Sequence, residues 1–182
     1  MRRLFFLAVL MAPMLIAADP AAESARAKLA LIEDDKAAPG SVIVFTPAEL
    51  NAWIRAELAE ESEVGLQEPK LELGDGTASF EVLADFQKLA GGEAGMFARM
   101  LEGERKVKLV AQPETSAGKI TIRLKRVEIS GVPLTGILLN LAAKLVLSRV
   151  YEETEIDQPF EMGHNIDHAV IEPTGLTVFI KK

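Results

Sequence analysis

Alternation of apolar and polar residues in the middle of the chain restricts this region to antiparallel sheet. Between residues 71 and 86 apolar side chains recur at every second position on both sides of Gly74-Asp75-Gly76. A period of two places these side chains on one face of a strand, and a glycine-rich turn between two such runs is typical of a hairpin. We therefore expect a hairpin with one buried face. Its second strand carries, on that face, Ala78, Phe80, Val82, Ala84 and Phe86.

The same alternation around a turn predicts two further hairpins. Residues 107–111 and 120–124 alternate around a turn at residues 115–118, and residues 166–171 and 176–180 flank a turn at residues 172–175. In the hairpin around residues 115–118 the alternation is interrupted after Leu124, because the next apolar residues are Val127 and Ile129. An odd step near Lys125-Arg126 predicts a β-bulge and a bend in a long strand.

Helical spacing appears before the first hairpin. Apolar residues recur at helical spacing between residues 19 and 36, at Ala22, Ala25, Leu29 and Ile32. A short apolar run at residues 41–45 predicts a strand. It is followed by Thr46-Pro47-Ala48-Glu49, in which Thr46 can cap a helix and Glu49 can close a capping box.

The segment from residue 134 to residue 150 is apolar around most of a helical circumference. The polar residues Asn140, Lys144 and Ser148 form one narrow stripe. Such a helix must be covered on nearly all sides. Runs of strands with segregated helices define the α+β class, so we predict one bent antiparallel sheet of about six strands that wraps this long apolar helix as a half-barrel.

Residues 1–18 have the three parts of a secretory signal peptide: Arg2 and Arg3, the apolar stretch 4–16, and the small pair Ala17-Ala18. An uncleaved anchor is the alternative, although the stretch is shorter than the about 20 residues that span a bilayer. We expect a periplasmic or secreted protein after cleavage. An N-terminal helix and linker at residues 19–40 should precede a single α+β domain at residues 41–182, since about 150 residues is typical of one domain.

Composition and motifs argue against several functions. Asp and Glu outnumber Lys and Arg by 27 to 20, and the net charge of −7 opposes nucleic-acid binding. The chain has no cysteine, which excludes disulfides and zinc–cysteine sites. His164 and His168 would lie about 13 Å apart on a strand, too far for a single metal ion. With no G-x-S-x-G or phosphate-binding glycine motif, we expect no enzyme activity, no cofactor and no bound metal.

An incomplete closure between sheet and helix would leave room for an acyl chain. The residues predicted to line this groove are Phe80, Val82, Phe86, Leu109, Ile122, Ile137, Leu141 and Leu145. A short apolar helical face between Gly91 and Gly103 is a candidate gate, because methionine adapts to variable apolar shapes. The gate residues are Met96, Phe97, Met100 and Leu101. The alternatives are a core helix without a ligand and a loop that plugs one end of the core.

Basic residues alternate along the outer surface predicted for the second hairpin. Lys106 and Lys108 share one strand face, and on the other strand the face is shared by Lys119, Thr121, Arg123 and Lys125. We expect the two sets to lie side by side. They could contact anionic lipid headgroups, or they could pair with acidic residues of neighbouring strands at about 0.2–1 kcal/mol per pair. The expected acidic partners are Glu72, Glu81 and Asp85.

The order of elements resembles that of small exported bacterial proteins of the tubular lipid-binding (TULIP-like) type, such as the YceB-like lipoproteins. The resemblance spans residues 41–181 and rests on the stretch at residues 45–54, on Gly131-Val132-Pro133-Leu134 and on Pro159-Phe160. It implies a long helix cradled by a strongly bent antiparallel sheet, with an apolar groove that holds a lipid. It implies no catalytic residues. This chain departs from the lipoproteins because it lacks an anchoring cysteine.

Two hypotheses about function follow. The first is an exported, non-enzymatic module that binds a lipid or another apolar ligand in the groove. The second is a structural or adaptor domain with a filled core that acts through a protein partner. An enzyme ranks third because no constellation with usable spacing is present.

Overall fold

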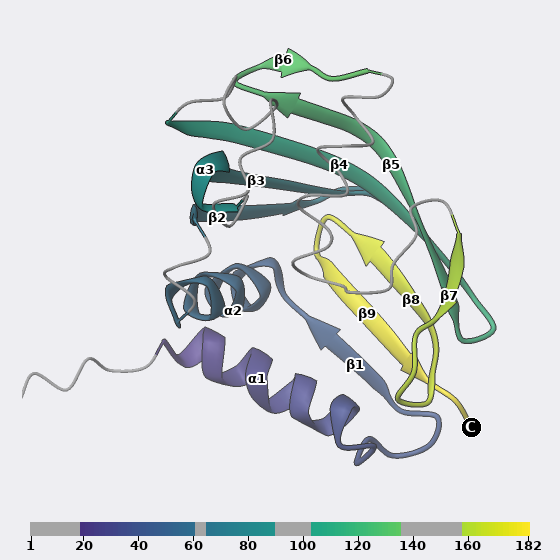
Figure 1. The fold of residues 1–182 in the computed structure, drawn as a ribbon. Coiled ribbons are helices and arrows are strands. Elements are labelled where there is room, and N and C mark those ends of the chain that lie inside the picture. Colours follow the sequence, from purple (N-terminus) through teal and green to yellow (C-terminus); the bar gives the residue numbers. More distant parts are fainter. Residues whose placement is uncertain (1–18, 61–64, 90–102, 136–157) are drawn as a thin grey trace, which may run out of the picture.

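The computed structural model describes residues 19–60, 65–89, 103–135 and 158–182. These residues form two antiparallel sheets and three helices (Figure 1). The helices are α1 (Pro20–Glu33), α2 (Pro47–Glu60) and α3 (Phe86–Leu89). The strands are β1 (Val42–Phe45), β2 (Leu66–Leu73), β3 (Ala78–Asp85), β4 (Glu104–Ser116), β5 (Lys119–Ile129), β6 (Val132–Pro133), β7 (Pro159–Glu161), β8 (Ile166–Glu172) and β9 (Gly175–Ile180).

The strands divide into a small and a large sheet. The small sheet has the order β1-β9-β8, and the large sheet has the order β2-β3-β4-β5-β6, with β7 also paired to β5. The α+β class is therefore confirmed, but the prediction of one sheet is wrong. The strand predicted at residues 41–45 pairs with β9 from the far end of the chain, a long-range pairing that local alternation does not encode. The described strands do not close into a barrel.

All three predicted hairpins are confirmed. β2 pairs with β3 around Gly74-Asp75-Gly76, β4 with β5 around Ala117-Gly118, and β8 with β9 around Pro173-Thr174. The bulge predicted near Lys125-Arg126 is also present, because Val110 faces Arg126 and Ala111 faces Leu124, which leaves Lys125 without an opposite residue. In Figure 1 the two long strands of this hairpin bend as they pass from the top of the molecule down to β7.

Two clusters of buried side chains form the core. The first lies on the large sheet and α3 and is made of Val82, Ala84, Phe86, Leu89, Val107, Leu109, Val127 and Ile129. The second joins α1, α2 and the small sheet and is made of Ala25, Ile32, Phe45, Leu50, Val178 and Ile180. Leu71 and Leu73 of β2 pack against this second cluster. The large sheet therefore contributes to both cores.

Hydrogen bonds outside the regular ladders connect the two sheets. The Thr115 hydroxyl of β4 donates to the Ala169 carbonyl of β8 at 2.7 Å and accepts from the Ala169 amide at 3.0 Å. The Gly118 amide donates to the Asp167 carbonyl at 2.6 Å, and the Gly76 amide to the Ile171 carbonyl at 3.0 Å. These bonds reach alternate residues on the outer edge of β8, so the two hairpin turns of the large sheet cover an edge that would otherwise be open to strand addition.

The side chain of Asn51 covers part of the edge strand β2 in a similar way. Its side-chain amide donates to the Leu71 carbonyl and accepts from the Leu71 amide, both at 2.8 Å. The side chain thus replaces one residue of a missing strand and fixes α2 to the large sheet. The sequence gives no sign of this role, because an amide on a helix carries no periodic signal that it is half-buried.

We expect Asn51→Ala to lower the free energy of unfolding by about 1–3 kcal/mol, because two half-buried backbone groups lose their partner. Urea denaturation followed by circular dichroism measures this loss. The control is Gln67→Ala, which removes an exposed 2.9 Å side-chain bond to Glu104 and should change stability by less than about 0.5 kcal/mol. Equal effects of the two changes would show that Asn51 does not hold α2 on β2.

Candidate ligand-binding face

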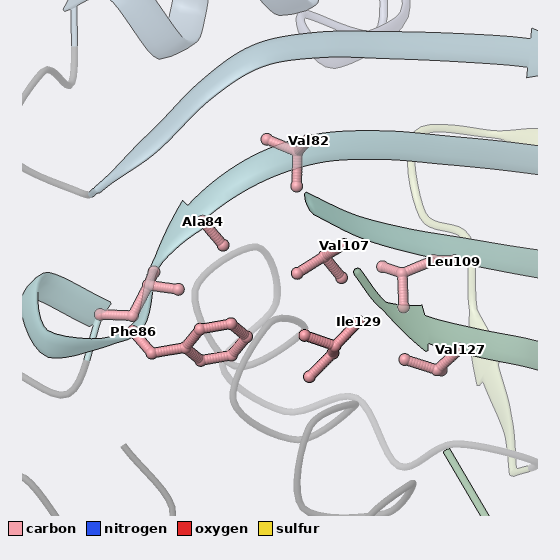
Figure 2. Close-up of a cluster of buried hydrophobic side chains, with 8 residues drawn as sticks. Val82, Ala84, Phe86, Val107, Leu109, Val127 and Ile129 are labelled. Atoms are coloured by element: carbon pink, nitrogen blue, oxygen red, sulfur yellow. The ribbon is translucent and has the colours of Figure 1, made fainter. Parts of the chain in front are cut away.

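The inner face of the large sheet is a continuous apolar surface across β3, β4 and β5. Phe80 of β3 lies opposite Leu109 of β4, which lies opposite Val127 of β5, and Val82, Val107 and Ile129 form the next row. Directly opposite residues point to the same side of a sheet. Figure 2 shows these aliphatic side chains together, with the ring of Phe86 pointing toward Ile129.

Two bulges keep this face apolar along its strands. In β5 the extra residue Lys125 allows both Leu124 and Val127 to point inward, although they are three positions apart. In β2 the register shifts between Gln67 and Lys70, and Glu68 has a φ of 50°. This bulge allows both Leu66 and Leu71 to point inward, although they are five positions apart. This second bulge was not predicted from the sequence. The odd spacing of Leu66 and Leu71, with Pro69 between them, was the signal that could have revealed it.

Four of the predicted groove residues meet on the inner face. Val82, Phe86 and Leu109 are buried members of the first core cluster, and Phe80 packs against it. Phe86 is the first residue of α3 rather than part of the strand, and the Asp85 carboxylate caps this turn by accepting from the Gln87 amide at 3.0 Å. Ile122 lies on the same side of β5, opposite Pro113, but on the turn side of the bulge and outside the cluster.

The remaining predicted residues lie outside the described parts of the chain. They are the groove residues Ile137, Leu141 and Leu145 and the gate residues Met96, Phe97, Met100 and Leu101. The predicted signal peptide at residues 1–18 lies outside them as well. Five described cluster members were not named as groove residues. Leu89 lies in α3, and the other four belong to the alternating phases that predicted the strands: Ala84, Val107, Val127 and Ile129.

The outer surface of the large sheet carries paired charges. Lys106 pairs with Glu81 at 2.9 Å, Arg123 with Glu114 at 2.7 Å, and Lys119 with Glu161 at 3.6 Å. The hydrogen bond from Lys106 lowers the pKa of Glu81. The predicted pairing with Glu81 is confirmed, whereas Glu72 pairs with Lys70 of its own strand and Asp85 lies nearest Lys88.

The basic residues of this surface do not form one patch. The expectation that the two sets lie side by side is wrong, because Lys108 lies opposite Glu128 whereas Arg123 lies opposite Gln112, nearer the turn. In an antiparallel hairpin, residues early in one strand face residues late in the other. The first set therefore lies toward the open end of the hairpin, and the second runs from the turn to the bulge at Lys125. The surface offers little concentrated positive charge to a lipid headgroup.

The histidines occupy different environments. His164 lies in the turn before β8 with a φ of 45°, and its Nδ1 is 3.9 Å from Asp35 Oδ1. His168 lies on β8, where its Nδ1 is 2.8 Å from Asp167 Oδ2 and its ring stacks on Phe179 at 4.2 Å between centroids. Among the described residues, no three His, Asp or Glu side chains come close enough to share a metal ion.

Glu49 is the most perturbed carboxylate of the described residues and forms the centre of the contact between α1 and α2. Its Oε1 accepts from the Ser24 hydroxyl at 2.5 Å and from Lys28 Nζ at 2.6 Å, and its Oε2 accepts from the Thr46 amide at 2.8 Å. Burial alone would raise the pKa of Glu49, but the hydrogen bonds from Lys28, Ser24 and Thr46 overcome it and lower the pKa to about 2. The Thr46 hydroxyl accepts from the Glu49 amide at 3.2 Å, which confirms the predicted capping box. This cluster is structural, because its charges are mutually satisfied.

No family model, curated protein or solved structure matches this chain. The resemblance to tubular lipid-binding proteins therefore remains an expectation drawn from the sequence. Among the described helices, none combines the length and the apolar character needed to cross a bilayer.

Proposed function

We propose that this protein is an exported, non-enzymatic module that binds an acyl chain or a similar apolar ligand against the inner face of the large sheet. The observation that carries the proposal is the continuity of this face. Apolar side chains from β3, β4 and β5 meet row by row, and two bulges place leucines of β2 and β5 on the same side. Apolar walls with few polar groups are typical of sites for apolar ligands.

The alternative is a structural or adaptor domain with a filled core. Burial of the inner face is expected under both proposals, because a core packed only with protein side chains also excludes water. The two differ in whether an added acyl chain reaches the inner face. A probe that reports from this face, with a matched reporter elsewhere, distinguishes them.

The chain has a single tryptophan, Trp53, which packs against the second core cluster and not the first. This allows two reporters. The wild type reports from α2, and the double variant Trp53→Phe with Phe80→Trp reports from the inner face. Phe80 suits the indole because it is only partly buried at the border of the first cluster.

We expect a brominated fatty acid, added to delipidated protein, to quench most of the fluorescence of the double variant and little of that of the wild type. Bromine quenches an indole at close contact, so the difference locates the acyl chain. Unbrominated fatty acid is the control for indirect changes. Equal quenching of both proteins, or none in either, would contradict a ligand on the inner face and favour the filled-core adaptor.

A further inference from the structure

The outer face of the small sheet carries exposed apolar side chains, and none of the described helices or strands covers it. Val42 and Val44 of β1 are 51% and 48% exposed, and Val170 of β8 is 40% exposed. The strand register places all three on one side of the sheet, because Val42 lies opposite Phe179, and Val44 and Val170 both lie opposite Thr177. The second core cluster uses the other side, through Phe45 and Val178. We call the surface formed by Val42, Val44, Val170, Thr177, His168 and Phe179 the valine face.

Positive charge lies at one end of the valine face. An open pocket of about 390 Å³ borders the stacked rings of His168 and Phe179 and is also lined by Lys181 and Lys182. Both lysines are exposed, and neither forms an ion pair with another described residue. Among the described residues that line this pocket, Asp167 is the single acidic one, and it bonds to His168.

We propose that the valine face docks on a bilayer surface that contains anionic lipids. The valines and Phe179 would enter the headgroup boundary, and Lys181 and Lys182 would contact lipid phosphates. Exposed apolar patches of this kind mark interaction sites, and an apolar surface with basic residues at its border fits the boundary between acyl chains and headgroups. The proposal goes beyond ligand binding and does not depend on it, since it concerns the opposite sheet.

The net charge of −7 makes a general attraction to anionic membranes unfavourable. Binding must therefore depend on these particular lysines. A lysine near an anionic surface contributes about 1 kcal/mol, so we expect Lys181→Gln with Lys182→Gln to weaken binding to phosphatidylglycerol-containing vesicles about thirtyfold. The matched control is Lys108→Gln with Lys125→Gln, two lysines of the large sheet that form no ion pair with described residues. This control should bind as the wild type does.

The apolar part is tested by Val42→Gln with Val170→Gln, which we expect to weaken binding about tenfold by removing apolar area from the interface. Its matched control is Leu31→Gln with Val132→Gln, because these side chains are 46% and 63% exposed but belong to α1 and β6. Vesicle flotation measures binding, with phosphatidylcholine alone and with added phosphatidylglycerol. Light scattering measures the oligomeric state of each protein.

The wild type should float with anionic vesicles and less with phosphatidylcholine alone, and added salt should release it. The proposal is overturned if the wild type does not float, or if the control pairs reduce binding as much as the test pairs. It is also overturned if the valine pair converts a wild-type dimer into a monomer without affecting flotation, because the face would then cover a second copy of the chain. None of these results depends on whether the inner face binds an acyl chain.

Discussion

Glu49→Gln should lower the free energy of unfolding by about 3 kcal/mol, because it leaves the Lys28 ammonium beside a neutral partner in a largely buried site. Glu49 is only 8% exposed and is bonded by Ser24, Lys28 and Thr46. The control is Glu57→Gln on the same helix, which breaks an ion pair with Arg26 between side chains that are both more than a third exposed. Exposed pairs contribute about 0–1 kcal/mol. Urea denaturation that gave equal losses for the two variants would contradict a central role for Glu49.

The same carboxylate should make stability depend on pH. Its pKa is about 2 in the folded protein, against an ordinary value of 4.5. A lowered folded-state pKa means that the unfolded chain binds more protons in this range, so the stabilisation is complete above pH 4.5 and is lost as the pH falls toward 2. We expect the difference between wild type and Glu49→Gln to shrink over this interval. A difference that stays constant from neutral pH to pH 2 would contradict the assignment.

Phe86→Ala should lower the free energy of unfolding by about 3–5 kcal/mol, because it removes a ring that is fully buried in the first core cluster and leaves a cavity. Phe86→Leu keeps most of the volume and should cost about 1.5 kcal/mol. Both losses are measured from the shift of the urea midpoint, with the slope of the unfolding free energy against urea concentration unchanged.

The comparison of alanine with leucine separates loss of packing from a general change at this position. If both variants lose the same small amount, the ring does not fill the core at the end of β3. If alanine loses several times more than leucine, the first cluster is a cooperative part of the fold, and the inner face on which a ligand would lie is rigid.

Features encoded by neighbouring residues were predictable from the sequence. The capping box at Thr46 and Glu49, the three hairpin turns and the bulge at Lys125 all depend on spacing within a few positions, and each is present. The alternation of apolar and polar residues predicted which side chains of β3, β4 and β5 point inward. Phe80, Val82 and Leu109 are among these side chains, and they lie together in or against the first core cluster.

Features that depend on long-range pairing were not predictable. The four residues of β1 alternate no differently whether they join the large sheet or pair with β9. The roles of Lys28 and Asn51 were missed for a related reason. A polar residue on a helix gives no sign in the sequence that a distant carboxylate or strand edge will face it.

The exposure of the valine face was not predictable either. Val42, Val44 and Val170 have the apolar character of core residues, yet their exposure follows from the absence of a described layer over that side of the small sheet. From the sequence, the basic residues of the second hairpin had two possible roles, contact with lipid headgroups or pairing with acidic residues of neighbouring strands. Ion pairs such as Lys106 with Glu81 and Arg123 with Glu114 occupy much of the charge there.

Native mass spectrometry of the protein, purified from cells without detergent, tests the central claim most directly. A module that binds an apolar ligand should show a species heavier than the polypeptide by the mass of a lipid. Organic extraction should remove this species, and incubation with fatty acid or phospholipid should restore it. A single polypeptide mass before extraction, and again after incubation with either lipid, would contradict the account and leave the inner face as a filled core.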